Sequence, residues 1–280
     1  MRFLSDEAVA HLREITELPD LTGTRYEVLG ELGRGGMGVV YEVRDRELER
    51  TVAMKVVESD WRAEARIIAA LEHPGIVPIH DSGTLPDGRL YYTMKLVRGM
   101  RLDAWAQQDH GLTERLRLFA RICEPVAFAH ANGVVHHDLK PDNVMVGEFG
   151  AVLVMDWGVA GVGTPGYMAP EQDRGETPDA RSDVYALGAV LAFLLRDMSI
   201  PRALAAVIAR AKANDPNARY ANAEALADDV LRYLDQEPVS AYRENIAERA
   251  GRWLTRHRAL LTLMAAYVLM RVIVFFWMRL

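Results

Sequence analysis

The segment from residue 136 to residue 158 constrains this chain most strongly, because it combines closely spaced carboxylates, a lysine and an asparagine. It begins His-His-Asp-Leu-Lys-Pro-Asp-Asn, and the triplet Asp-Trp-Gly follows, with Asp156 thirteen positions after Asn143. Asp138 can accept a proton from a hydroxyl group, and Lys140 can lie against a phosphoryl group. Asn143 and Asp156 offer oxygen ligands for Mg²⁺. This spacing predicts an enzyme that transfers phosphate.

The composition suits a folded domain that binds no nucleic acid. Half of the 280 residues are hydrophobic, which is ample for a buried core. Residues 243–280 contain seven Arg against two Glu, so the rest of the chain carries 26 basic and 37 acidic side chains, or −11. This acidic body argues against general nucleic-acid binding. The single Cys123 excludes an internal disulfide, and its apolar surroundings predict a core position.

The pattern of apolar residues divides the chain into a β-rich part and a helical part. Alternating or clustered β-branched and aromatic residues predict strands over residues 26–31, 39–43, 51–57, 76–80 and 90–97. Helices are predicted over residues 5–18 and 61–71, and helical periodicity dominates from residue 102 onward. We therefore expect a small antiparallel sheet followed by a larger helical lobe.

A glycine-rich turn lies between the first two predicted strands. Residues 33–40 fit the pattern G-x-G-x-x-G-x-V, in which missing side chains let the backbone approach nucleotide phosphates. The glycine-rich turn of a dinucleotide-binding site opens a helix, whereas here the chain continues as a strand. The pattern therefore favours a loop in which Gly33, Gly35, Gly38 and Val40 cover a bound nucleotide.

Taken in order, these motifs resemble those of protein kinases. Residues 52–55, Val-Ala-Met-Lys, are similar to the kinase strand whose lysine pairs with the α- and β-phosphates, which implies nucleotide-binding roles for Ala53 and Lys55. Glu64, on the helix predicted over residues 61–71, occupies the place of the glutamate that pairs with this lysine. An unrelated surface lysine and surface glutamate are the alternative interpretation.

The resemblance also identifies a hinge. Met94 is similar to the gatekeeper residue, and the hinge that would hydrogen-bond adenine through its backbone runs from Lys95 to Val97. The resemblance covers roughly residues 26–234 and is closest to bacterial serine/threonine kinases, on the strength of the stretch Gly-Arg-Gly-Gly-Met-Gly-Val-Val-Tyr. It implies an α+β, two-lobed fold with a small antiparallel β lobe and a larger helical lobe.

Within the catalytic segment, the resemblance assigns each side chain a role. Asp138 would orient and deprotonate the acceptor hydroxyl, and Lys140 would offset charge on the γ-phosphate of ATP. Asn143 and Asp156 would hold Mg²⁺. Thr164 would contact Asp138 and Lys140.

Other motif residues are expected to support the site rather than to react. His136 would pack against Trp157, and Asp183, on the helix that begins near it, would brace the catalytic loop. Glu171 and Arg219 match a buried ion pair of the family.

Three segments are shorter than the family usually has, namely residues 56–63, 159–168 and 189–218. The second offers only Thr164 and Tyr167 as hydroxyls, and His137 stands where an arginine usually receives an activation-loop phosphate. We therefore expect no phosphate switch of that kind. The third segment corresponds to a helix with which family members dock substrates, so its shortening affects protein phosphorylation more than ATP binding.

The C-terminal residues 259–278 predict a transmembrane helix. Twenty residues span about 30 Å as a helix, which matches a bilayer core. The only charge in this segment is Arg271, and ten Leu, Ile, Val and Phe residues outweigh its cost of insertion. Four arginines precede the segment within ten residues and only Arg279 follows it, so we expect the kinase-like domain on the cytoplasmic side of the cell membrane. With only Arg279 and Leu280 after the span, we expect no sensing domain beyond it.

The predicted organisation is an N-terminal extension (residues 1–25), a kinase-like domain (26–235, with lobes of about 26–97 and 98–235), a basic juxtamembrane linker (236–258) and the single membrane span. One function is a membrane-anchored serine/threonine kinase that uses ATP and Mg²⁺ on protein hydroxyls. Another is a pseudokinase that binds nucleotide and acts as a membrane-tethered scaffold, which the three short segments favour. A small-molecule kinase of related fold is a more distant alternative.

Overall fold

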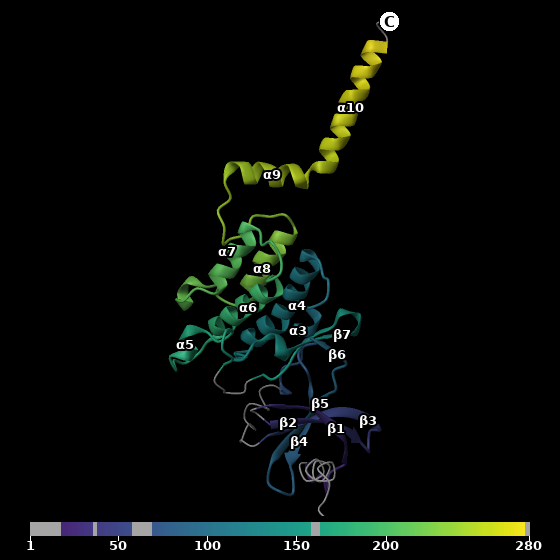
Figure 1. The fold of residues 1–280 in the computed structure, drawn as a ribbon, viewed down its shortest axis with the longest axis vertical. Coiled ribbons are helices and arrows are strands. Elements are labelled where there is room, and N and C mark those ends of the chain that lie inside the picture. The colour runs from purple at the N-terminus through teal and green to yellow at the C-terminus, as the bar shows by residue number, and fades with distance from the viewer. Residues whose placement is uncertain (1–17, 36–37, 58–68, 158–162, 278–280) are drawn as a thin grey trace, which may run out of the picture.

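The chain folds into a β-rich lobe and a helical lobe, which confirms the predicted α+β architecture (Figure 1). The computed structural model describes residues 18–35, 38–57, 69–157 and 163–277. The helices predicted over residues 5–18 and 61–71 lie outside this description except at their last positions, and so does most of the predicted N-terminal extension.

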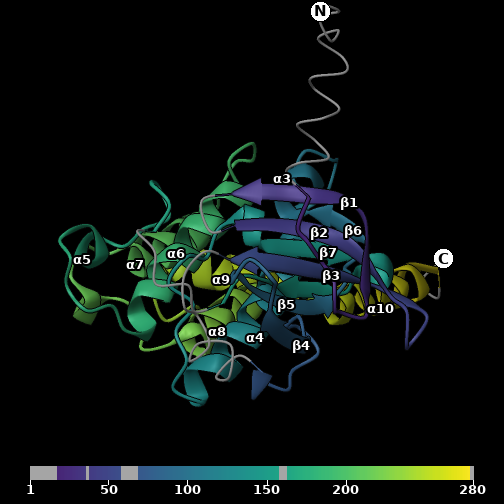
Figure 2. The same cartoon turned by 90° about the horizontal axis from the view of Figure 1, so that it is seen from below.

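The first lobe is a five-stranded antiparallel sheet in the order β1-β2-β3-β5-β4. Its strands lie side by side in Figure 2. They are β1 (Tyr26–Gly35), β2 (Gly38–Asp45), β3 (Arg50–Val57), β4 (Ile79–Thr84) and β5 (Leu90–Lys95). Alternate residues of β1 to β3 and β5 pack under one face of the sheet, including Tyr26, Tyr41, Met54 and Tyr91. This period of two is the pattern from which the strands were predicted.

Two of the predicted strands differ from the structure by more than two residues at an end, and the other three differ by one or two. β1 continues through the glycine-rich stretch to Gly35, because Gly35 still pairs with Gly38 of β2. β4 begins at Ile79 rather than at Ile76. Ile76 instead forms a parallel bridge with Val154 of the second lobe, and the Val154 amide donates to the Gly75 carbonyl at 2.8 Å. An apolar run predicted as a strand thus joins the two lobes.

A small second sheet carries the catalytic segment. It consists of β6 (Gly99–Arg101), β7 (Val144–Gly147) and β8 (Val152–Val154), all antiparallel. A 3₁₀ turn, Pro141–Asn143, leads directly into β7, and a second one, Glu148–Gly150, joins β7 to β8. Residues 138–143 and Asp156 therefore lie before and after one hairpin, which holds them close to each other.

The helical lobe consists of α3 (Leu102–Trp105), α4 (Leu112–Ala131), α5 (Pro170–Asp173), α6 (Ala180–Leu194), α7 (Arg202–Ala211) and α8 (Ala223–Leu234), with a 3₁₀ turn over Pro216–Ala218. Asp179 and Asn222 cap α6 and α8 by accepting from backbone amides of the first turn. One continuous core joins α4, α6, α7 and α8, and Cys123 is fully buried in it as predicted.

Two helices follow the lobe, α9 (Ile246–Arg256) and α10 (Arg258–Trp277). The region expected as a linker, residues 236–258, therefore contains a regular helix. A transmembrane helix was predicted over residues 259–278. Among the described residues, no single helix passes by itself as a membrane span in both length and hydropathy, so this prediction is not shown by the structure. The bent pair Ile246–Arg256 and Leu261–Phe275 reaches that length and composition when both parts are taken together, with 74° between them.

Candidate active site

The glycine-rich turn forms the roof of the site. Gly38 adopts a φ of 123°, and a Cβ there would collide with the Val56 carbonyl oxygen of the neighbouring strand. Only glycine fits this position. Gly33 and Gly35 differ, since no atom of the described residues lies within 4 Å of where their Cβ atoms would be. Their missing side chains leave open space beside the backbone that a ligand can approach.

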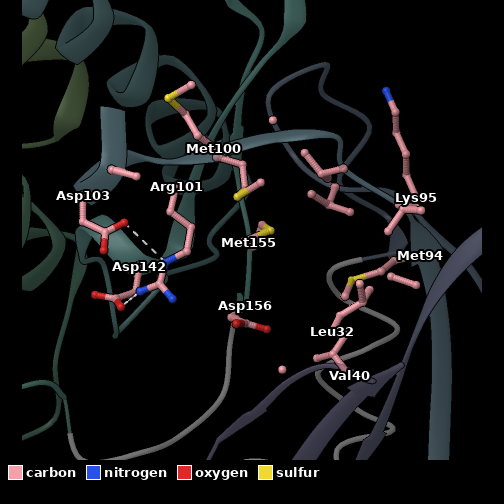
Figure 3. A pocket seen from close by; sticks show the side chains of 18 residues that line it. Leu32, Val40, Met94, Lys95, Met100, Arg101, Asp103, Asp142, Met155 and Asp156 are labelled. Carbon is pink, nitrogen blue, oxygen red and sulfur yellow. Dashed lines mark ion pairs between the residues drawn. The ribbon is translucent and has the colours of Figure 1, made fainter. Parts of the chain in front are cut away.

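An apolar cavity of about 610 Å³ lies between the lobes beneath this turn (Figure 3). Its volume is typical of sites that bind a small molecule. Six residues predicted to bind nucleotide line it, together with the predicted metal ligand Asp156 and with Leu32, Val77, Met145 and Met155 from outside the prediction. The six are Gly33, Val40, Ala53, Met94, Lys95 and Val97.

The ammonium group of the hinge residue Lys95 does not point into this cavity. The Lys95 side chain extends away from the cavity in Figure 3. Met94 pairs with Ala53 across β3 and β5, so the two side chains that would bound adenine come from adjacent strands. The Lys95 amide donates to the Pro78 carbonyl at 3.3 Å, so this amide is already engaged within the first lobe.

A second cavity, of about 370 Å³, lies next to the first and is polar. Gly35 and Gly38 line it from the roof, and Lys55, Asp138, Lys140, Asn143 and Asp156 line its other walls. Lys55 is buried in β3, and its Nζ lies 2.5 Å from Asp156 Oδ1. Asp156 has a φ of 57°, a left-handed conformation that is uncommon for aspartate and more frequent at functional sites. Glu64, predicted to pair with Lys55, lies outside the described residues.

Asp138, Lys140 and Thr164 form a closed set of contacts. The Lys140 ammonium donates to Asp138 Oδ2 at 2.6 Å and to Thr164 Oγ1 at 2.7 Å. The Thr164 hydroxyl and amide donate to Asp138 Oδ1 at 2.8 and 3.1 Å. These are the contacts that the family resemblance implied for Thr164. Burial alone would raise the pKa of the Asp138 carboxyl, but the hydrogen bonds from Lys140 and Thr164 outweigh burial and lower it below its ordinary value.

Asn143 closes the catalytic loop on itself. Its amide nitrogen donates to the Asp138 backbone carbonyl at 2.8 Å and lies 3.3 Å from Asp138 Oδ2. Because the nitrogen makes both contacts, the side-chain oxygen is the atom available to a cation. No cluster of three or more His, Cys, Asp or Glu that could hold a metal occurs within the described residues. Two oxygen ligands suit Mg²⁺, which is commonly held by one or two side chains together with phosphate oxygens.

Asp183 braces the loop from below, as expected. Its carboxylate accepts from the His136 and His137 amides at 2.7 and 3.0 Å, and His130 Nε2 lies 2.8 Å away. His137 has a φ of 70°, which this double hydrogen bond stabilises. The His136 ring packs on Trp157 with 4.8 Å between the ring centroids. Burial lowers the pKa of His136, which favours the neutral ring and a supporting role.

The predicted ion pair between Glu171 and Arg219 is present and buried. The guanidinium donates to both carboxylate oxygens, at 2.6 and 2.7 Å, and Ser182 donates to the same carboxylate at 2.8 Å. Burial alone would raise the pKa of Glu171, but these hydrogen bonds lower it to about 2. The pair fixes the end of the segment that carries Thr164 to the body of the lobe.

Arg101 is a site residue that was not predicted from the sequence. This residue lines both cavities and forms ion pairs with Asp142 of the catalytic loop and with Asp103, as Figure 3 shows. The register between β6 and β7 brings these residues together, and no sequence motif reports that register. The only available signal was the position of Asp142 within the loop, next to Asn143.

Comparison with known proteins agrees with this geometry. Residues 26–203 match the protein kinase domain model. The serine/threonine-protein kinase PknB of Mycolicibacterium smegmatis is 34% identical over 83% of this chain and 48% of its own length. PknD of Chlamydia felis is 30% identical over 85% of this chain and 34% of its own length. The chain thus spans about half, or less, of the length of these curated relatives.

Solved structures agree as well. The crystal structure of the Mycobacterium tuberculosis PknI kinase domain superimposes with a TM-score of 0.65 and 28% identity, and it covers 77% of this chain and 98% of that domain. The matched family model, the shared fold and the order of the motifs together identify the chain as a member of the protein kinase family, among the bacterial serine/threonine kinases.

Proposed function

We propose that this chain transfers the γ-phosphate of ATP to serine or threonine hydroxyls of protein substrates. The observation that carries the proposal is the set of contacts among Asp138, Lys140 and Thr164, next to Asn143 and Asp156 at the polar cavity. Five side chains from three separated segments meet there in the arrangement that phosphate transfer requires.

Each side chain has a role that its surroundings support. Asp138, ionised at neutral pH because its pKa is lowered, accepts the proton of the substrate hydroxyl. Lys140, already bonded to Asp138, offsets negative charge on the transferring phosphoryl group. Thr164 holds both in position through its hydroxyl.

The two cavities fit ATP and Mg²⁺. The apolar cavity suits adenine, with Lys95 and Val97 offering backbone groups, and the polar cavity suits phosphates beneath Gly33 and Gly35. Lys55 would bind phosphate oxygens, and Asn143 and Asp156 would hold Mg²⁺. When bound, ATP and Mg²⁺ supply the transferable group and neutralise its charge.

We also propose that activity needs no phosphate on the segment that contains Thr164. The Thr164 hydroxyl is fully engaged by Asp138 and Lys140, so a phosphate there would place negative charge against the Asp138 carboxylate. A chain phosphorylated at Thr164 and more active for it would contradict this proposal.

We further propose that α10 anchors the kinase in the cell membrane, with the kinase domain in the cytoplasm. α10 has twenty residues, about 30 Å in length. Its large apolar side chains are exposed rather than packed on the lobes, for example Leu263, Tyr267, Leu269 and Ile273. More arginines lie just before the apolar part of α10, at its N-terminal end next to the lobes, than after it.

Transfer of radiolabelled phosphate from ATP tests the kinase proposal. Wild-type chain, Asp138→Asn and Asp173→Asn would be compared in one detergent, with the chain itself and a generic basic protein as acceptors. Asp173 is exposed on α5, so it controls for the loss of one carboxylate. We expect Asp138→Asn to lose about 10²–10⁴-fold in rate and Asp173→Asn to match wild type. Nucleotide binding without transfer in any of the three would favour the pseudokinase scaffold.

A further inference from the structure

We propose that α9 lies in the headgroup region of a membrane containing anionic phospholipids, with its apolar face toward the acyl chains. The helical lobe would then rest against the membrane surface rather than hang from a flexible linker. This inference rests on the proposed anchoring by α10 and adds a second, separate membrane contact.

The apolar side chains of α9 share one face of the helix, and this face is exposed rather than packed on the described core. Ile246, Ala250, Trp253 and Leu254 recur at the spacing i, i+4, i+7 and i+8, which places them on one side. Ile246 is 90% exposed, Trp253 54% and Leu254 52%. α9 contributes no buried residue to the core. A surface helix of a soluble domain normally turns such a face inward.

The opposite face of α9 is polar, and this face contacts the helical lobe. Arg252 donates to Glu244 at 2.6 Å and to the Gln236 carbonyl at 3.2 Å. Glu248 accepts from Tyr242 at 3.0 Å, and Arg256 lies 3.5 Å from Glu237. Because the polar face is turned toward the lobe, the apolar face points away from it.

The bend between the two helices gives this apolar face a definite direction. α9 crosses between the lobe and α10, and α10 leaves on the side away from the lobe (Figure 1). The two helices are bent by 74° at their junction. If α10 crosses a bilayer nearly perpendicular to the membrane plane, α9 lies close to that plane. The apolar face of α9 then points in the same direction as α10, into the bilayer.

Charge and side-chain type favour lipid over protein as the occupant. Arg249, next to Ala250 on α9, and Arg243, three residues before Ile246, are exposed and make no ion pair with any residue that the structure describes. Arginines beside an apolar stripe attract anionic headgroups, and tryptophan prefers the membrane interface. Trp253 belongs to the stripe, and its ring lies against His257, tilted by 51° with 4.8 Å between the ring centroids.

Depth-dependent quenching in reconstituted bilayers tests the inference on the full chain. Three single substitutions, Leu254→Cys, Thr255→Cys and Leu269→Cys, would carry an environment-sensitive fluorophore, since the native Cys123 is buried. Thr255 is the matched control, because it is exposed next to Leu254 but lies toward the polar side. Vesicles of phosphatidylcholine with phosphatidylglycerol would contain lipids brominated either near the headgroup or deep in the chain.

We expect shallow bromines to quench the label at position 254 several-fold more than the label at position 255, and deep bromines to quench the label at position 269. Quenching at 269 with none at 254 would overturn this inference and leave the anchor intact. Absence of quenching at 269 would reject the anchor itself. Protection of position 254 together with disulfide cross-linking of Leu254→Cys between copies would overturn the inference in favour of a protein interface.

Discussion

Three buried carboxylates shape the candidate site, and each is stabilised by a different kind of partner. Asp138 has an ammonium group and a hydroxyl, Glu171 has a guanidinium, and Asp183 has two backbone amides and a histidine. Burial alone would raise the pKa of Asp183, but hydrogen bonds and nearby histidines lower it overall. All three therefore remain ionised where a solitary buried carboxyl would be protonated.

Removing one partner of the buried pair should be costly. We expect Arg219→Ala to lower the free energy of unfolding by about 3–5 kcal/mol, because Glu171 would be left as an uncompensated buried charge. Urea denaturation measures this change. Arg174→Ala is the control, since it breaks a surface pair with Glu176 at 2.6 Å and should have no measurable effect. Equal losses in both variants would show that burial of the first pair is unimportant.

The same pair should make stability depend on pH in the acidic range. The pKa of Glu171 is lowered from its ordinary 4.5 to about 2 in the folded chain. The unfolded chain therefore binds this proton first as the pH falls. The stabilisation should be complete above pH 4.5 and decline as the pH falls from 4.5 toward 2. The difference in unfolding free energy between wild type and Glu171→Gln, measured across this range, should shrink with falling pH, and a constant difference would contradict the assignment.

At the scale of elements, the sequence predicted what depends on local patterns and missed what depends on pairing between distant segments. Alternation located the strands of the first sheet, and the glycine pattern located the turn after β1. The bridge of Ile76 to Val154 and the contact of Arg101 with Asp142 could not be predicted, because each needs the register of two separated segments. The helix α9 did leave a local signal, the capping box of Asn245 and Glu248.

α6 and α7 are joined by a short connection and pack closely against each other. This close packing depends on one glycine, Gly188. A Cβ at Gly188 would lie 2.7 Å from the Ala211 Cβ, which belongs to a side chain that cannot rotate away. We expect Gly188→Ala to destabilise the domain by about 1–3 kcal/mol despite the better helix propensity of alanine.

The glycine of α9 provides the comparison for Gly188. Within the part of the chain that the structure describes, nothing lies within 4 Å of a Cβ at Gly251, so Gly251→Ala should not lower the thermal midpoint. Calorimetry on both variants separates crowding from propensity. A Gly188→Ala variant as stable as wild type would mean that α7 can move outward freely.

At the scale of the whole molecule, the folded core ends before the last two helices begin. Val239 is the last residue of the buried core, with Tyr242 packed against it. Asp229 binds the segment between α8 and α9 by accepting from the Ser240 amide at 2.7 Å and from the Ala241 amide at 3.1 Å. We therefore expect the lobes to be stable without α9 and α10.

Truncation tests that boundary. We expect a chain of residues 1–242 to keep the thermal midpoint of the full chain, because the removed helices bury no described residue in the core. A chain of residues 1–236 should unfold at a lower temperature, since it loses Val239 and the partners of Asp229. Equal midpoints for the two truncations would show that this segment is dispensable.

The bridge between Ile76 and Val154 has a mechanical consequence. The lobes are joined by the hinge at residues 95–97 and, at a separate place, by the Gly75–Val154 hydrogen bond and this bridge. Because a body held at two places turns most easily about the line through them, we expect opening of the cleft to follow mainly that one rotation axis. A motion about that axis would keep β3 in register with the second lobe, so we expect closure to return Lys55 to its place beside Asp156.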